Sequence, residues 1–136
     1  MSSVKNQGAT PWCGQFADTA ALESQAMIHE SRPNTNLDLS EQAMISCNSS
    51  NPSTSIYGLD YLETIGLPPE SYLPYNGGVG TCADVASGWQ AQVKKIRGYK
   101  NLPTNVSAQE MISNMKSAIY NHGPITVSLE VFSRFL

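Results

Sequence analysis

Cys13 is the residue of this sequence best placed to do covalent chemistry. It stands where an irregular segment containing Gly8 and Pro11 gives way to a helical pattern, so we expect it in the first turn of a helix. The unpaired N–H groups and the dipole at a helix N-terminus favour the thiolate, which is the nucleophilic form of cysteine. A lone cysteine at a helix start is more often simply packed, and the neighbouring residues must decide between these interpretations.

Gln7 lies six residues before Cys13 and supplies a second functional group. Its side-chain amide can donate a hydrogen bond to the oxyanion that forms when a thiolate attacks a carbonyl, and the backbone N–H of Cys13 is a second donor. A histidine is needed as general base and acid, but His29 is expected at the far end of the same helix, roughly 24 Å away. His122 belongs to a different segment. Cys13 and Gln7 are therefore candidate catalytic residues, with a simply packed cysteine as the alternative, and we predict that neither histidine is catalytic.

Helices dominate the elements that must position these residues. The first is predicted to run from Cys13 to just before Arg32-Pro33. It is expected to bury a stripe of mostly small residues, namely Phe16, Ala17, Ala20, Ala21, Ser24, Met27 and Ile28. The other predicted elements are a short helix capped by Ser40, a helix over 57–65, a helix opened by the capping box Ser107–Glu110, and strands over 93–99 and 124–131.

The composition limits the class of protein. With 136 residues, 40% hydrophobic and 14% charged, the chain is long enough for a globular domain with a core, and its net charge of −3 argues against nucleic-acid binding. No apolar run reaches the length of a membrane span, and the first twelve residues lack the apolar core of a signal peptide. We expect no membrane or nucleic-acid partner.

The three cysteines form no recognisable metal site. No two of them have CxxC spacing and the two histidines are isolated, so we expect no metal and no cofactor. In a secreted protein an odd number suggests one disulfide and one free thiol, whereas in a cytosolic protein all three could be reduced.

Five ordered blocks of the sequence resemble papain-like (cathepsin-type, peptidase family C1) cysteine proteases. The spacing of six between Gln7 and Cys13 agrees with that family. The blocks are VKNQG at 4–8, the nucleophile segment at 9–16, LSEQAMISC at 39–47, GLDYLETIGLPPESYLPY at 58–75 and GPITVSLE at 123–130.

The resemblance implies an α+β papain-like fold. Residues 1–92 would form the mainly helical left domain, with the nucleophile helix at 13–29, and residues 93–136 would begin an incomplete β-barrel right domain. The implied function is that of a cysteine endopeptidase, which hydrolyses peptide bonds through an acyl-enzyme. The family histidine and asparagine lie roughly 130–150 residues beyond the cysteine. We therefore expect this chain to be a partial catalytic domain, truncated before both and inactive alone.

The resemblance also implies partners and a compartment. The partners would be a peptide or protein substrate, a pro-segment and a cystatin-like inhibitor. A disulfide between Cys47 and Cys82 is implied, which leaves Cys13 as the free thiol and points to a secreted, lysosomal or vacuolar location. Thr10 stands where the family has a cysteine of another disulfide, whose partner is also absent here.

Substrate-binding residues are expected around the nucleophile. Gly14 stands where the family has Trp, and Trp12, before the nucleophile, is expected to fill similar space. Ser53 and Thr54 fall in a loop that is shortened relative to the family's Asn-Gly-Gly run, and Ser128 matches a position on the wall of the pocket for the second substrate residue.

Two other function classes remain open. A non-catalytic binding or regulatory protein could have kept this fold, and Gly14 with the altered loop fits such a protein. A redox or acyl-transfer protein is the third hypothesis, and only the thiol itself speaks for it.

Overall fold

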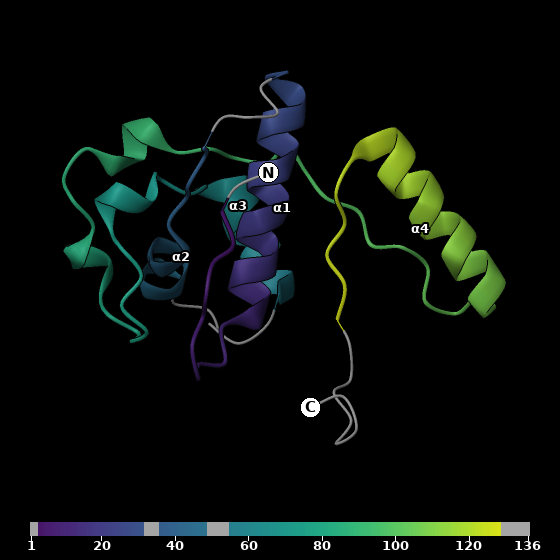
Figure 1. Ribbon diagram of the computed structural model, residues 1–136, viewed down its shortest axis with the longest axis horizontal. Helices are drawn as coiled ribbons and strands as arrows, with labels where there is room; N and C mark the ends of the chain where they lie inside the picture. The colour runs from purple at the N-terminus through teal and green to yellow at the C-terminus, as the bar shows by residue number, and fades with distance from the viewer. Residues whose placement is uncertain (1–2, 32–35, 49–54, 129–136) are drawn as a thin grey trace.

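The computed structural model describes residues 3–31, 36–48 and 55–128, with the backbone alone for 55–57. Within these ranges α1, α2 and α3 form one helical body, and α4 lies apart from it (Figure 1). The helices are α1 (Cys13–His29), α2 (Glu41–Cys47), α3 (Ser55–Thr64) and α4 (Ala108–His122), with short 3-10 helices η1 (Glu70–Tyr72), η2 (Cys82–Asp84) and η3 (Trp89–Gln92).

The core lies where α1 packs against α2 and α3. Its buried apolar residues come from these three helices and from the segments beside them, so the helices are held by burial rather than by their own propensity. They are Leu22, Leu39, Ala43, Met44, Tyr61, Leu62 and Leu67.

The bounds of α1 confirm the predicted first helix, but the predicted buried stripe is wrong. Ala17, Ala20 and Ile28 are exposed, and only Met27 of that stripe is fully buried. The face turned toward α2 and α3 is instead largely polar, with Gln15, Asp18, Thr19, Leu22, Glu23 and Met27 buried. Apolar periodicity failed here because this face of α1 buries polar side chains, of which Glu23 binds the Lys5 ammonium and the backbone N–H of Leu39.

The caps of the other predicted helices are confirmed. The Ser40 hydroxyl accepts a hydrogen bond of 2.9 Å from the N–H of Ala43 at the start of α2. The Ser107 hydroxyl accepts one of 3.2 Å from the N–H of Glu110 at the start of α4. Gly66, just after α3, adopts the left-handed conformation that ends a helix.

Neither predicted strand forms a ladder within the described residues. Over 93–99 there is a single antiparallel bridge, in which Lys94 and Leu67 exchange hydrogen bonds of 2.8 and 2.9 Å. Residues 124–128 carry no strand assignment, and the rest of that predicted strand lies outside the described residues. A strand needs a neighbour that is paired over several residues, and within the described residues only the Lys94–Leu67 bridge forms at these positions.

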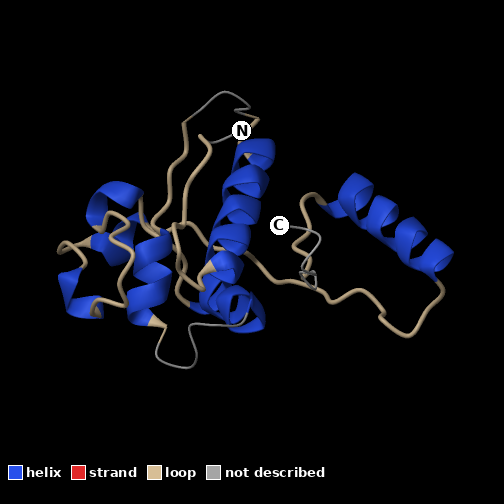
Figure 2. Ribbon diagram, turned by 60° about the horizontal axis from the view of Figure 1, so that its bottom comes forward, coloured by secondary structure: helices blue, strands red, loops and turns tan. Residues whose placement is uncertain are grey.

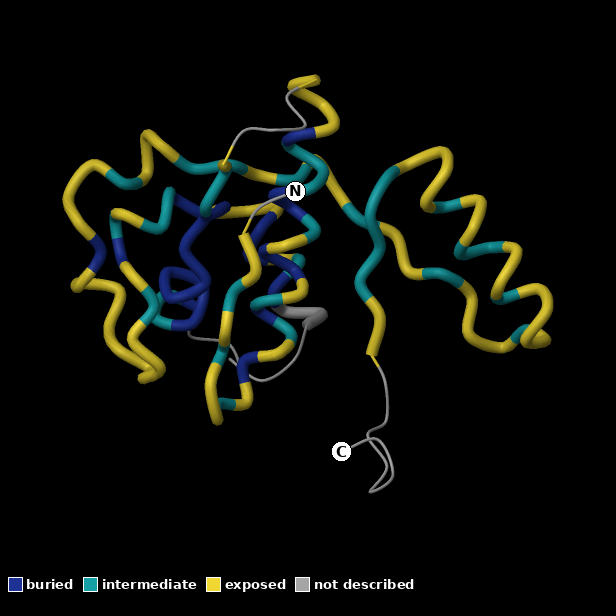
Figure 3. The backbone as a smooth tube through the Cα atoms, viewed as in Figure 1, coloured by how far each residue is buried: buried dark blue, intermediate teal, exposed yellow. Residues whose placement is uncertain are grey.

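Helix α4 has no buried residue, and the chain returns from it to α1 (Figures 2 and 3). A Cβ at Gly123 would collide with the Gln25 side chain, and the Thr126 side chain lies beside Asp18. Since Gln25 comes after Asp18 in α1, the segment 123–128 runs antiparallel to this helix, toward the end that carries Cys13.

A disulfide joins Cys47 at the end of α2 to Cys82 at the start of η2. The pairing agrees with the one that the resemblance implied. It closes a loop of 35 residues and leaves Cys13 as a free, exposed cysteine.

Candidate active site

Cys13 is the first residue of the 17-residue helix α1, and its thiol is exposed and free. The first turn contains no acidic residue, so no carboxylate on this turn opposes a negative charge on the sulfur. The first N–H groups of a helix have no intrahelical partner. The backbone N–H of Cys13 is one of them, so it is a potential hydrogen-bond donor. An accessible thiol at this position can act as a nucleophile.

The loop before α1 is held by a reciprocal pair of hydrogen bonds between Gln7 and Thr10. The Gln7 side-chain amide donates to the backbone carbonyl of Thr10 at 2.8 Å, and the Thr10 hydroxyl donates to the backbone carbonyl of Gln7, also at 2.8 Å. Gly8 turns the chain between them with a φ of +65°. An amide group has two N–H bonds, so one remains for an oxyanion.

Tyr75 attaches this loop to the helical body. Its hydroxyl donates to the Gln7 carbonyl at 2.8 Å and lies 2.8 Å from the Thr10 hydroxyl. Its ring meets Phe16 of α1 edge-on, with 5.0 Å between the ring centroids. The backbone N–H of Tyr75 donates to a carboxylate oxygen of Glu70 at 2.7 Å.

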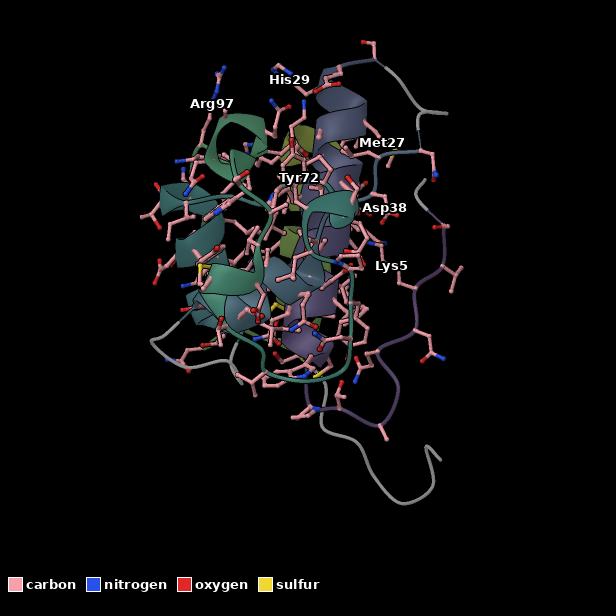
Figure 4. The ribbon with its side chains drawn as sticks, turned by 90° about the vertical axis from the view of Figure 1, so that its left-hand side faces the viewer. Lys5, Met27, His29, Asp38, Tyr72 and Arg97 are labelled. Atoms are coloured by element: carbon pink, nitrogen blue, oxygen red, sulfur yellow. A yellow bond between two sulfur atoms is a disulfide. The ribbon has the colours of Figure 1, made fainter. Side chains whose placement is uncertain are left out.

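Lys5, which precedes the loop, forms a charge cluster in which the carboxylates of Glu23 and Glu41 are buried. Its ammonium lies 2.8 Å from carboxylate oxygens of Asp38 and Glu41 and 3.2 Å from one of Glu23 (Figure 4). It also donates to the Leu39 carbonyl at 2.8 Å. Burial works to lower the pKa of Lys5, but the nearby carboxylates outweigh burial and raise it. The cluster fixes the segment before the Gln7 loop on α1 and α2.

Two carboxyl groups near the site have strongly raised pKa values. Asp18 is completely buried in α1, and burial raises its pKa to about 7. Thr126 lies beside it and favours ionisation, yet neither carboxyl oxygen accepts a hydrogen bond of normal geometry within the described residues. Burial likewise raises the pKa of Glu70 to about 7, against the hydrogen bond from the backbone of Tyr75.

The expected substrate-binding residues differ in how far they are exposed. Gly14 is half-buried beside Cys13, and Ser128 is exposed on the segment that runs toward this end of α1. Trp12, expected near the substrate, is only 7% exposed and its indole N–H lacks a partner among the described residues. Its side chain therefore packs beneath the helix start. Ser53 and Thr54 lie outside the described residues.

Each histidine is the last residue of a helix, whereas Cys13 is the first residue of α1. His29 is the last residue of α1, exposed at the end opposite Cys13 (Figure 4). His122 is the last residue of α4 and is also exposed.

The described ranges contain neither a candidate metal site nor a candidate membrane span. Among their His, Cys, Asp and Glu residues no group of three could hold a metal ion. No helix there is long and apolar enough to cross a membrane.

Sequence reasoning missed the role of Tyr75 and the burial of Asp18. The only signals were Thr10 in the place of a family cysteine and Tyr75 at the end of the block 58–75. Neither indicated that the two side chains meet. Asp18 gave no signal, since an aspartate on a helix is usually exposed.

Comparison with known proteins identifies the family. Cysteine proteinase 2 of Entamoeba histolytica is 29% identical over 98% of this chain, and the viral cathepsin of Choristoneura fumiferana nuclear polyhedrosis virus is 31% identical over 96%. The chain spans about two fifths of the length of these relatives, 41% and 38%.

Solved structures of cysteine proteases are also similar to this chain. A cysteine protease of Carica candamarcensis in complex with E-64 is 26% identical, with a TM-score of 0.63 over 85% of this chain and 54% of its own. The proform of the ragweed pollen cysteine protease Amb a 11 is 29% identical, with a TM-score of 0.63 over 76% of this chain and 31% of its own. The sequence model of the papain family cysteine proteases matches residues 1–136, and the chain therefore belongs to this family.

Proposed function

We propose that Cys13 is the nucleophile of a papain-type cysteine endopeptidase and that Gln7 lies in its oxyanion hole. The observation that carries this proposal is an exposed free thiol on the first residue of α1, preceded by a loop in which the Gln7 amide is anchored with one N–H to spare. The thiolate would attack a peptide carbonyl, and the Gln7 amide and the Cys13 N–H would bind the oxyanion.

We also propose that these 136 residues alone do not hydrolyse peptides. An imidazole must take the thiol proton and later protonate the leaving amine. The sequence has two histidines, and His29 lies 16 residues after Cys13 on one helix, roughly 24 Å away. His122 ends α4 and precedes Gly123, where a Cβ would meet Gln25 of α1, 12 residues after Cys13.

The boundary between the two domains is proposed near residue 93. Before it, the described residues form the body that contains the core, whereas α4 beyond it has no buried residue. A peptide substrate would cross the start of α1 beside Gly14, near Ser128. The family resemblance also makes Ser53 and Thr54 proposed substrate-binding residues, and both lie outside the described residues. The buried Trp12 would support the helix start.

The partners are proposed from two solved structures, and the cellular compartment is proposed from the disulfide. The proform of the ragweed protease supports a pro-segment, and the complex of the Carica protease with E-64 supports a site open to inhibitors, including cystatin-like proteins. The disulfide between Cys47 and Cys82 supports a secreted, lysosomal or vacuolar location.

Covalent labelling tests the nucleophile. The chain is incubated with E-64 under non-reducing conditions and its intact mass is measured, together with turnover of a fluorogenic peptide. We expect one adduct, absent from Cys13→Ala, and no turnover. Thiol-dependent turnover that disappears in Cys13→Ala would refute the proposed inactivity.

A non-catalytic binding protein is the second candidate, and Gly14 in place of the family's tryptophan favours it. In that case Cys13 would react no faster with E-64 than a cysteine of the urea-unfolded chain does. A rate well above that of the unfolded chain favours the peptidase.

A further inference from the structure

Three oxygen atoms meet behind the nucleophile loop. The Gln7 carbonyl oxygen, the Thr10 hydroxyl and the Tyr75 hydroxyl lie 2.8 Å from one another in all three pairs. Only the two hydroxyls carry hydrogens. In one arrangement both donate to the carbonyl, and in the other one donates to the carbonyl and the second donates to the first. The Gln7 carbonyl therefore keeps at least one donor in either arrangement.

The same contact fixes the direction of the Gln7 side chain. Its amide donates to the backbone carbonyl of Thr10, whose own hydroxyl is held by Tyr75. Both ends of Gln7, its backbone carbonyl and its side-chain amide, are thus bound to one polar cluster. Loss of the Tyr75 hydroxyl would therefore change the orientation of the Gln7 amide, although the two groups are not in contact.

Tyr75 is itself held rigidly enough to serve as an anchor. Its ring packs edge-on against Phe16 of α1, and its backbone N–H is bound by the Glu70 carboxylate. The next residue, Asn76, donates its N–H to the Gln42 side chain of α2 at 3.1 Å. The hydroxyl of Tyr75 therefore ties the loop to α1 and α2 together.

We infer that Tyr75, acting with Thr10, is a positioning residue that orients the Gln7 amide toward the oxyanion. This inference rests on the proposed function of Gln7. In this chain a pair of hydroxyl groups holds the loop at the place where no disulfide ties it, since Thr10 has no sulfur and Cys13 is free. Tyr75 touches no substrate and acts only through Gln7.

Nuclear magnetic resonance of the Gln7 side-chain amide tests the inference. In ¹⁵N-labelled protein the two amide peaks are assigned by their loss in Gln7→Glu, and their hydrogen-exchange rates are measured. Tyr75→Phe keeps the ring on Phe16, and Thr10→Val keeps the shape of Thr10. The control, Tyr99→Phe, removes a hydroxyl that binds Asp60 on the surface, remote from the loop.

We expect a small rise in exchange for each single variant, because the remaining hydroxyl still serves the Gln7 carbonyl. The double variant Thr10→Val/Tyr75→Phe should raise exchange about fivefold or more, the factor that one net hydrogen bond represents. Its amide peaks should also move toward those of free glutamine. Peaks and rates equal to those of Tyr99→Phe would overturn the inference. If the double variant does not fold, the small rise expected for Tyr75→Phe is measured against Tyr99→Phe, and equal exchange rates in these two variants overturn the inference.

Alkylation of Cys13 by iodoacetamide separates this inference from the proposed function. The reaction forms no oxyanion, so Tyr75→Phe should leave its rate unchanged while the Gln7 amide changes. An unreactive Cys13 in the unsubstituted chain would refute the nucleophile but leave the positioning result intact. A rate that changes in Tyr75→Phe by as much as the amide exchange does would indicate general loosening of the loop, and it would overturn the positioning role.

Discussion

The carboxylate of Asp18 fills the space that a side chain at Gly58 would need. A Cβ built on Gly58 of α3 would collide with an oxygen of Asp18 on α1 and would lie 3.3 Å from the sulfur of Met44 on α2. The three helices of the body meet at this point. A buried carboxyl group and a glycine are therefore matched across the α1–α3 contact.

Gly58→Ala is expected to lower the free energy of unfolding by about 1–2 kcal/mol. Overpacking a core contact costs about 1–3 kcal/mol, and the better helix propensity of alanine returns up to about 1 kcal/mol. Urea denaturation followed by circular dichroism measures the change. In the background of Asp18→Ala the collision is gone, so the same substitution should be neutral or stabilising. An equal cost of Gly58→Ala in both backgrounds would contradict the proposed contact.

The stability of the protein should fall as the pH rises from about 4 to about 7. The pKa of Asp18 is about 7 in the folded chain against 3.8 as its ordinary value, so between these values the folded state binds more protons. Its contribution is complete below pH 4 and is lost as the pH rises through about 7, with a slope of at most about 1.4 kcal/mol per pH unit. Glu70, whose pKa is also raised to about 7, acts in the same direction.

Asp18→Asn separates the two carboxyl groups in that pH profile. Asparagine does not ionise, so the urea midpoint should depend less on pH, with the part due to Glu70 left. The matched control is Glu63→Gln, which removes an exposed carboxylate on α3 and should leave the slope as it is. An unchanged slope in Asp18→Asn would show that Asp18 does not hold its proton in the folded state.

Lys5→Met should destabilise the chain by about 3–5 kcal/mol at neutral pH. Glu23 and Glu41, whose side chains are each 2% exposed, would lose the ammonium that pairs with them. Lys94→Met is the control, because its ion pair with Glu30 is exposed and is worth about 0–1 kcal/mol. Urea denaturation compares the two variants, and equal losses would contradict the pairing of Lys5 with two buried carboxylates.

Removal of the disulfide should cost about 3–4 kcal/mol, because Cys47 and Cys82 close a loop of 35 residues. Cys47→Ala/Cys82→Ala is compared with the oxidised chain by urea denaturation, both carrying Cys13→Ala so that no thiol exchange occurs. Dithiothreitol should lower the midpoint of the oxidised protein only. A response of the double variant to dithiothreitol would point to another effect of the reagent.

The helices, their caps and the pair of Cys47 and Cys82 could be predicted from the sequence because local signals or family blocks carry them. The hydroxyl groups of Ser40 and Ser107 cap the next turn, and such contacts span only three residues. The buried face of α1 could not be predicted, since its polar residues are buried against partners far along the chain. Lys5 binds Glu23 and Glu41, which lie 18 and 36 residues away.

The sequence by itself determined the family, the position of Cys13 at a helix start and the spacing to Gln7. The helix start and the spacing are properties of neighbouring residues, and the family is carried by five ordered blocks along the sequence. Only the tertiary structure decided that Tyr75 holds the Gln7 loop and that Asp18 is buried against Gly58. These contacts join residues 68 and 40 positions apart. Such pairs meet only when α1, α2 and α3 pack, and no local pattern encodes which side chains will then face one another.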